Sequence, residues 1–214
     1  MRRGAMILLS AVALVAGCHR AEIEGDGVIK TEDRRIADFS GIDVAGRYEI
    51  KWSSDKPAMA ISADENLLPL ISTEVNDGTL EISSKGNLGP TQSITINLSS
   101  ASLADVKLTG GNRFRAGSLS GSKLKLKSTG ASEITVEGSV SELDVALTGA
   151  SKLNAKSLKT RNATLSLIGA SDADITVTDT LKVFVAGAAS LNYSGNPKSV
   201  EQKVTGAGRI RPWP

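Results

Sequence analysis

The chain has 214 residues, with 25 lysines and arginines, 23 aspartates and glutamates, one histidine and one cysteine. The single histidine excludes a histidine-rich metal site and argues against histidine-based catalysis, and the single cysteine excludes an internal disulfide or a cysteine-pair zinc site. The 21 glycines, set against three phenylalanines, two tyrosines and two tryptophans, indicate a thin core of aliphatic side chains.

The N-terminus predicts a lipoprotein signal peptide over residues 1–17. Two arginines precede an apolar stretch over residues 6–16, which is too short for an ordinary membrane span. The stretch ends in Leu14-Val15-Ala16-Gly17-Cys18, which resembles the bacterial lipobox. We therefore expect Cys18 to be lipidated, to become the new N-terminus and to anchor the protein to a membrane. The next residue, His19, is not the aspartate that commonly retains lipoproteins at the inner membrane, so the outer membrane is favoured.

Processing leaves a mature chain without net charge. Removal of two arginines reduces the 25 basic residues to 23, against 23 acidic residues. Lys123, Lys125 and Lys127 alternate and so share one strand face, but three lysines are more typical of a solvated face than of a nucleic-acid site. Residues 18–36, polar and without periodicity after the cysteine, predict a lipidated tether, and residues 37–214 predict the folded domain. Because the mature chain has no net charge and the lysine row is not a nucleic-acid site, nucleic acid is excluded as a partner.

The first half of the domain predicts short strands and one helical turn. Residues 76–79 (Asn-Asp-Gly-Thr) are typical of a tight turn between strands. Residues 64–70 predict one helical turn that Pro69 stops. Period-2 alternation predicts the strands themselves at residues 39–44, 48–52, 59–63, 71–75, 80–82 and 94–98.

The second half contains an internal repeat. Small-residue turns recur every 18 to 20 residues around six glycines, which we interpret as structural: Gly110, Gly130, Gly149, Gly169, Gly187 and Gly206. Each repeat contains two strand-like pieces with one apolar face, for example Leu143, Val145 and Leu147 before the glycine. We therefore predict an all-β fold, a right-handed parallel β-solenoid with a period of about 19 residues. An antiparallel sandwich of evenly spaced hairpins is the alternative.

Two aromatic side chains have predicted positions in this solenoid. Trp213, near the chain end, is expected to cap the apolar column. Phe184 alternates with buried positions and is expected on the outer face.

Three stretches and the repeated turns match a known family. The stretches are Phe39-Ser40-Gly41-Ile42-Asp43-Val44 with Gly46, residues 61–68 and residues 75–82. On these the sequence resembles the putative auto-transporter adhesin, head GIN domain family, over residues 39–210. The resemblance implies a two-sheet superhelix with tight glycine turns, similar in shape to pectin-lyase-like helices. It also implies a role in adhesion without recognised catalytic residues.

The candidate catalytic groups favour a structural interpretation. Asp172 and Asp174 are two residues apart and so share a strand face, as the carboxylates of a polysaccharide-cleaving site would. No acidic position recurs across three coils, however, so we predict solvated charges, no metal and no cofactor. The turn serines Ser132, Ser151 and Ser171 have no histidine or lysine base in the motif, and we predict that they too are structural.

Together these patterns predict a lipid-anchored cell-envelope protein. We expect a non-catalytic adhesin-like or scaffolding module that uses one face of the solenoid. A glycan-binding or glycan-cleaving envelope protein is one alternative, and an envelope-sensing accessory that binds a partner protein is another. A surface glycan or an envelope protein is the expected partner besides the membrane, and the sequence leaves the ligand-binding residues open.

Overall fold

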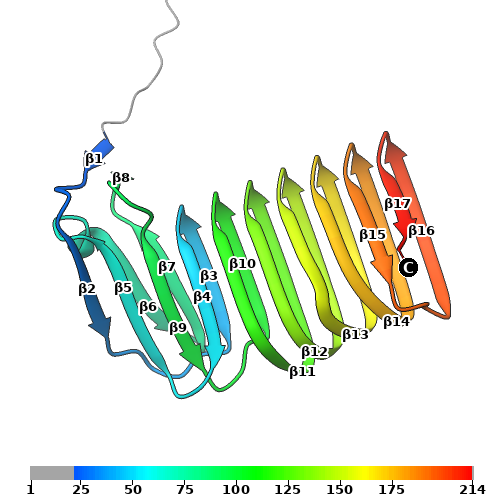
Figure 1. Ribbon diagram of the computed structural model, residues 1–214, viewed down its shortest axis with the longest axis horizontal. Helices are drawn as coiled ribbons and strands as arrows, with labels where there is room; N and C mark the ends of the chain where they lie inside the picture. Colours follow the sequence, from blue (N-terminus) through cyan, green and yellow to red (C-terminus); the bar gives the residue numbers. More distant parts are fainter. Residues whose placement is uncertain (1–21, 214) are drawn as a thin grey trace, which may run out of the picture.

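The described part of the chain is a stack of β-coils (Figure 1). The structure is a computed structural model that describes residues 22–213, so the predicted signal peptide, Cys18 and His19 lie outside the described residues. Consecutive coils pair in parallel and in register. The parallel β-solenoid prediction is therefore confirmed, and the sandwich alternative is wrong for the repeats. Among residues 22–213, no helix has the length and apolar character needed to cross a membrane.

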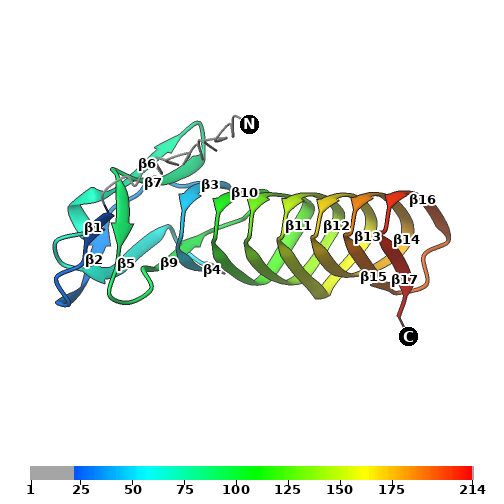
Figure 2. The ribbon, with the colours of Figure 1, turned by 90° about the horizontal axis from the view of Figure 1, so that it is seen from above.

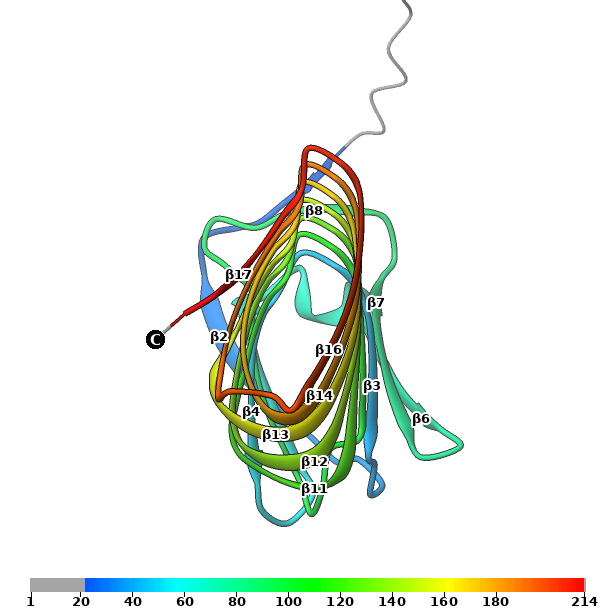
Figure 3. The ribbon, with the colours of Figure 1, turned by 90° about the vertical axis from the view of Figure 1, so that its right-hand side faces the viewer.

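Four long strands make the regular part of the stack. The first part of each strand lies on one face of the solenoid, the chain then bends, and the second part lies on the opposite face (Figure 3). The ladder register shifts at these bends, for example between Ala116 and Leu119. The strands are β11 (Arg113–Gly130), β12 (Glu133–Gly149), β13 (Lys152–Gly169) and β14 (Asp172–Gly187).

We name the two sheet faces after the first parallel strand of each. The β3 face contains β3 (Gly41–Gly46), β10 (Asp105–Gly110), the second parts of β11 to β14, and β16 (Ser199–Gly206). The β4 face contains β4 (Glu49–Ser54), the first parts of β11 to β14, β15 (Ser190–Ser194) and β17 (Arg209–Pro212). Aliphatic side chains from both faces meet in one column.

The column follows the predicted alternation. Leu143, Val145 and Leu147 are buried, and Asp144 and Ala146 between them are partly exposed on the outer side. One continuous apolar cluster runs from Phe39 in the first coil to Leu191 in β15. Each coil shares its apolar side chains with the coils on both sides, which explains why a single coil of this size would not be stable alone.

The glycine turns stack into a ridge along one edge of the solenoid. All six predicted turn glycines pair in register from coil to coil, and Gly46 pairs with Gly110 as an earlier member. Each has a positive φ, for example +112° at Gly149. A Cβ on Gly149 would lie 2.3 Å from the carbonyl oxygen of Gly130. Glycine is therefore required here both for its backbone conformation and for the close approach of the next turn.

Antiparallel strands close the N-terminal end of the stack. On the β4 face, β9 (Thr95–Ser100) is followed outward by β5 (Ala58–Asp64) and β2 (Ile29–Arg34), both antiparallel to their neighbours. On the β3 face, β7 (Thr79–Ser84) forms a hairpin with β6 (Ile71–Asn76). The turn between them has positive φ at Asp77 and Gly78, as the sequence predicted for a tight hairpin.

A short 3-10 helix, η1 (Leu68–Leu70), carries the chain from the β4 face to the β3 face across this end. The helical turn predicted for residues 64–70 is therefore present. Pro69 lies in its first turn rather than stopping it, because a proline at the start of a helix lacks only an amide hydrogen that has no helical partner.

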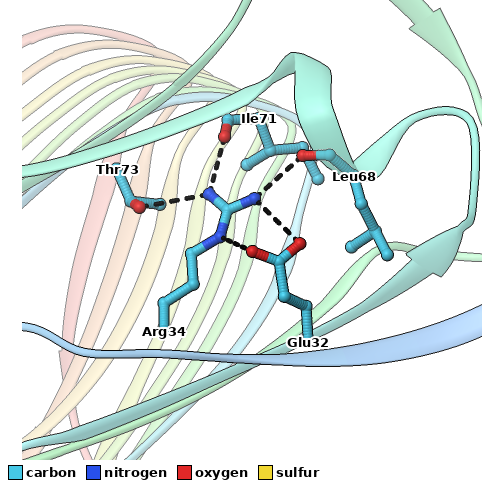
Figure 4. A network of polar contacts seen from close by, with 5 residues as sticks. All are labelled: Glu32, Arg34, Leu68, Ile71 and Thr73. Carbon is cyan, nitrogen blue, oxygen red and sulfur yellow. Dashed lines mark hydrogen bonds and ion pairs between the residues drawn. The ribbon is translucent and has the colours of Figure 1, made fainter.

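The guanidinium of Arg34 joins the two faces at the same end (Figure 4). Its Nη1 donates to the carbonyl of Ile71 (2.6 Å) and to the hydroxyl of Thr73 (3.1 Å), and its Nη2 donates to the carbonyl of Leu68 (2.8 Å). Its Nε donates to Glu32 at 3.0 Å, and the side chain is only 15% exposed. Because Arg34 lies on β2 and its carbonyl acceptors lie in η1 and β6, this one side chain fastens the β4 face to the β3 face.

Two further features differ from the sequence predictions. Within the range predicted as a tether, β1 (Glu22–Glu24) pairs with β8 (Asn87–Gly89), and β2 pairs with β5, so the folded body begins by Glu22. The prediction that Trp213 caps the apolar column is wrong. Its ring lies on the outer surface with the Lys156 Nζ 3.6 Å from the ring centroid, and its amide donates to the carbonyl of Tyr193. The chain end therefore leaves the stack sideways (Figure 3).

Candidate functional site

The outer side of the β4 face carries a row of charges that alternate in sign. Because the coils are in register, equivalent outward positions form a line along the solenoid. In chain order this line contains Glu49, Arg113, Glu133, Lys152 and Asp172. Arg113 donates from Nε to Glu133 at 3.1 Å, across one coil spacing. We call these five residues the alternating row.

The alternating row begins in a groove at the glycine edge. The groove has a volume of about 910 Å³ and lies between the glycine ridge and the flap made by β1, β8 and residues 90–94. Figure 1 shows β1 and β8 at the edge where the strands of the ridge end. Its charged lining residues are Glu22, Glu24, Arg47, Glu49, Arg113 and Glu133. We call it the flap groove.

Small residues make the floor of the flap groove. Gly110, Gly111 and Ala131 line it, and the exposed side chain of Arg47 lies above Gly111, whose Cβ position would be 3.9 Å from the Arg47 Cγ. Beside the floor, the amide of Tyr48 donates to the side-chain oxygen of Asn112 at 3.1 Å. Burial raises the pKa of the Tyr48 phenol, so this side chain carries no charge at neutral pH. The arginines therefore supply the positive charge of the groove, and the four glutamates supply the negative charge.

The predicted lysine row lies on the opposite, β3 face. Lys123 pairs with Glu142 at 3.7 Å and Lys125 pairs with Asp105 at 3.8 Å, all with exposed side chains. On the same face Lys107 contacts Asp43 at 2.7 Å, and this hydrogen bond with Asp43 raises the pKa of Lys107. The row is therefore part of a mixed-charge surface, and such exposed pairs contribute little to stability.

The candidate carboxylates do not converge. Asp172 and Asp174 share the outer side of β14 on the β4 face, where Asp174 contacts Lys156 at 3.3 Å and accepts a hydrogen bond from Asn192 at 2.8 Å. Glu142 lies on the other face of the solenoid. Within residues 22–213, no three or more histidine, cysteine, aspartate and glutamate side chains form a group that could hold a metal ion.

The turn serines are buried in a ladder beside the ridge. The hydroxyl of Ser151 accepts from the amide of Ser132 (3.2 Å), donates to the carbonyl of Gly130 (3.4 Å) and lies 2.9 Å from the hydroxyl of Ser128. Ser132 and Ser171 donate to the preceding glycine carbonyl in the same way. All three turn serines are at most 2% exposed, so they satisfy buried backbone groups and are not accessible to a substrate.

Sequence reasoning missed two parts of this arrangement. The flap groove requires Glu22, Arg47 and Arg113 to come together, and their separation along the chain carries no periodic signal. The second is the Arg34 network at the closed end, because Arg34 was assigned to the tether range.

Phe184 lies on the outer side of β14, as its alternation predicted, and is only partly exposed.

The fold and the glycine ridge define a parallel β-solenoid with two sheet faces. The chain belongs to the family described as "Putative auto-transporter adhesin, head GIN domain", whose model matches residues 38–197. No curated protein matches the chain.

Solved structures share this fold. One is a putative adhesin from Bacteroides fragilis, with a TM-score of 0.72, 21% identity, and coverage of 89% of this chain and 100% of that one. A putative adhesin from Parabacteroides merdae has a TM-score of 0.55, 22% identity, and coverage of 90% and 99%. A putative lipid binding protein from Parabacteroides distasonis has a TM-score of 0.52, 19% identity, and coverage of 91% and 100%. These similarities show the fold.

Proposed function

We propose that this protein is a lipid-anchored cell-envelope protein that acts as a non-catalytic, adhesin-like module, with the flap groove and the alternating row as its binding surface. The alternating row is the observation that carries the proposal. It places hydrogen-bond donors and carboxylate acceptors in turn, one coil spacing of about 4.8 Å apart. A surface glycan offers hydroxyl groups that both donate and accept, so it can follow such a row.

The absence of catalysis in this proposal rests on how the carboxylates are placed. Glycoside hydrolysis needs two carboxyl groups that face one bond, one of them with a raised pKa. On the β4 face each carboxylate of the alternating row lies next to a cation in register, as Glu133 does beside Arg113 and Lys152. Each of these carboxylates therefore has a cation as its neighbour in the ladder, and none faces a second carboxylate of the row across a single bond.

The proposed anchor is Cys18. The support is the lipobox-like sequence that ends in this cysteine and the position of Glu22, the first described residue, at the flap. An anchor there would attach the solenoid at its closed end and leave the β16 end away from the attachment point (Figure 1). Cys18→Ser should move the protein from the membrane fraction to the soluble fraction, and equal membrane association of both forms would contradict the anchor.

A glycan array with the purified full chain tests the binding surface. The variant Arg113→Ala/Lys152→Ala removes two cations of the alternating row, and we expect affinity for a bound glycan to fall at least about tenfold, the loss of one or two charge-assisted hydrogen bonds. The matched control is Lys123→Ala/Lys125→Ala on the β3 face, which should change affinity less than about twofold. Equal losses in both variants would contradict the assignment to the β4 face.

The envelope-protein partner is the second outcome of the same comparison. A chain that binds no glycan on the array, but binds isolated envelopes with the same dependence on Arg113 and Lys152, would replace the glycan with a protein partner. Loss of envelope binding only after the β3-face substitutions would contradict both forms of the proposal.

A further inference from the structure

The C-terminal end of the solenoid is open, in contrast to the closed N-terminal end. Within residues 22–213, β16 pairs only with β14 and β17 only with β15, so both are edge strands (Figures 1 and 2). At the column positions of β16, Val200 is 39% exposed and Val204 is 43% exposed, although they align with the buried Leu181 and Val185 of the preceding coil. In the part of the chain that the structure describes, the apolar column therefore ends at solvent.

The two edge strands differ in how they are protected. On β17 the amides of Arg209 and Trp213 donate to the preceding coil. Because successive amides of a strand point in opposite directions, the positions that face outward are Ile210 and Pro212. Pro212 has no amide hydrogen to donate there. The one outward amide that remains on β17 belongs to Ile210, and an arginine lies on each side of it. Proline and charge are ordinary protection for a sheet edge. β16 contains no proline, and its two charges, one glutamate and one lysine, are opposite in sign, so they do not repel an antiparallel copy of the same strand.

The outward backbone groups of β16 can be assigned from the register. The amide of Lys125 donates to the carbonyl of Ala104 in the preceding coil, and Lys125 is equivalent through the ladder to Glu201. The amides of Glu201 and Lys203 therefore point back to β14. Those that point outward, with their carbonyls, belong to Val200, Gln202 and Val204.

The sequence of this edge is complementary to itself in the antiparallel direction. Residues 200–204 read Val-Glu-Gln-Lys-Val. When two copies are paired about Gln202, each valine faces a valine, and each glutamate faces a lysine. The residues with outward backbone groups then oppose one another as hydrogen-bonded pairs. Glu201 and Lys203 oppose one another at the non-hydrogen-bonded positions, where cross-strand side chains are closest.

We propose that two copies of this chain form an end-to-end dimer in which the β16 strands pair antiparallel around a twofold axis at Gln202. The dimer covers Val200 and Val204 of both copies and continues the aliphatic column across the axis. Gln202 takes a column position, in register with Val183, and its amide meets the same amide of the second copy. This polar pair fixes the register, because a shifted pairing would place an unpartnered amide among valines.

Sedimentation equilibrium of the full chain, purified in mild detergent, tests the dimer. The unsubstituted chain is compared with variants in which the charges of β16 are changed. The unsubstituted chain should have twice the mass of one chain. Lys203→Glu places glutamates opposite each other twice, and the dissociation constant should rise at least about tenfold. Glu201→Lys/Lys203→Glu restores both opposite-charge pairs and should restore the dimer. Both residues are exposed, and circular dichroism confirms that the variants are folded.

A cysteine at the axis gives a second measurement that does not depend on charge. In Gln202→Cys the two Cα atoms would be about 5.5 Å apart, within reach of a disulfide, and mild oxidation should link the copies. Thr205→Cys is the matched control, because its two copies would be about 20 Å apart. The unsubstituted chain controls for linkage through Cys18.

The following outcomes would overturn the proposal. A monomer at every concentration, or a series of higher oligomers from head-to-tail contacts, excludes the twofold pairing. The twofold pairing is also excluded if the Lys203→Glu chain remains dimeric or if the charge exchange fails to restore the dimer. Equal disulfide linkage at positions 202 and 205 excludes it too.

Discussion

The two ends of this solenoid solve the same problem in different ways. The N-terminal end buries its last apolar layer under antiparallel strands, η1 and the Arg34 network, none of which repeats. The regular part, from β11 to β14, has no such devices, and each coil is stabilised by the equivalent coils before and after it. The comparison shows that stacking accounts for the interior of the repeat, whereas the N-terminal coil is covered by irregular sequence. The C-terminal coil is the one for which we propose a second molecule.

The largest expected effect is the loss of folding stability when a glycine of the stacked ridge is replaced, compared with a glycine outside the ridge. Gly149→Ala places a Cβ 2.3 Å from the carbonyl oxygen of Gly130 at a φ of +112°, and we expect a loss of about 3 kcal/mol or more. Gly78→Ala is the matched control. It also has a positive φ (+73°), but its Cβ would have no neighbour within 4 Å, so about 1 kcal/mol is expected. Urea unfolding followed by circular dichroism measures both, and equal losses would show that contact between turns is not the reason for glycine.

Removing the Arg34 network should open the N-terminal end. Arg34→Met leaves the carbonyls of Leu68 and Ile71 without their charged donor, with an expected loss of about 2–3 kcal/mol. Arg34→Lys should recover less than half of this, since an ammonium group cannot reproduce the planar fork. Hydrogen exchange should show lost protection in β2 and β6 but not in β12. Uniform loss along the solenoid would contradict a local closing role.

The serine ladder tests the interior of the repeat. Ser151→Ala removes hydrogen bonds to Ser128, to the Ser132 amide and to the Gly130 carbonyl, and should destabilise the fold by about 1–2 kcal/mol. Ser128→Ala/Ser151→Ala should lose less than the sum of the single variants, because each single change leaves the other hydroxyl without this partner. Strict additivity in thermal unfolding would show that the two hydroxyls act independently.

The smallest expected effect is the pH dependence of one buried carboxylate in the irregular region. Asp64 accepts hydrogen bonds from the Thr91 hydroxyl and from the amides of Gly27 and Thr91. The Thr91 hydroxyl is the largest of the causes that hold the pKa of Asp64 below its ordinary value. Its stabilisation is therefore complete above about pH 3.9, the unfolded value, and is lost as the pH falls through the lowered pKa.

An NMR titration of the Asp64 carboxyl carbon measures this pKa directly. Thr91→Val should raise the pKa toward the ordinary value, and the protection of the Gly27 amide should then weaken at a higher pH than in the unsubstituted chain. An Asp64 midpoint that is the same in both chains would show that the hydroxyl does not set the pKa.

The regular part of the fold was predictable because its signal is local and repeated. Gly130, Gly149 and Gly169 recur at a spacing that the ladder reproduces residue for residue. The closed end was not predictable in the same way. The pairing of β2 with β5 and the reach of Arg34 to Ile71 depend on contacts 25 or more residues apart in sequence, which leave no period.

The candidate site shows the same division. The lysines at 123 and 125 could be assigned to one strand face from alternation alone, and they lie on one. The alternating row was hidden, because its members alternate in sign from coil to coil and become a row only when the register is known. Trp213 was placed wrongly because the sequence does not show that its amide bonds to Tyr193, which turns the ring outward over Lys156.

The in-register glycine ridge makes length a property that can change without redesign. A segment such as residues 150–169 begins and ends at equivalent points of the ridge, so its duplication or loss leaves both neighbouring turns intact. Each such event would lengthen or shorten the molecule by one strand spacing, about 4.8 Å, and add or remove one member of each outward line. Duplication or deletion of a coil in the gene can therefore change the length of the solenoid while the structures at both of its ends stay the same.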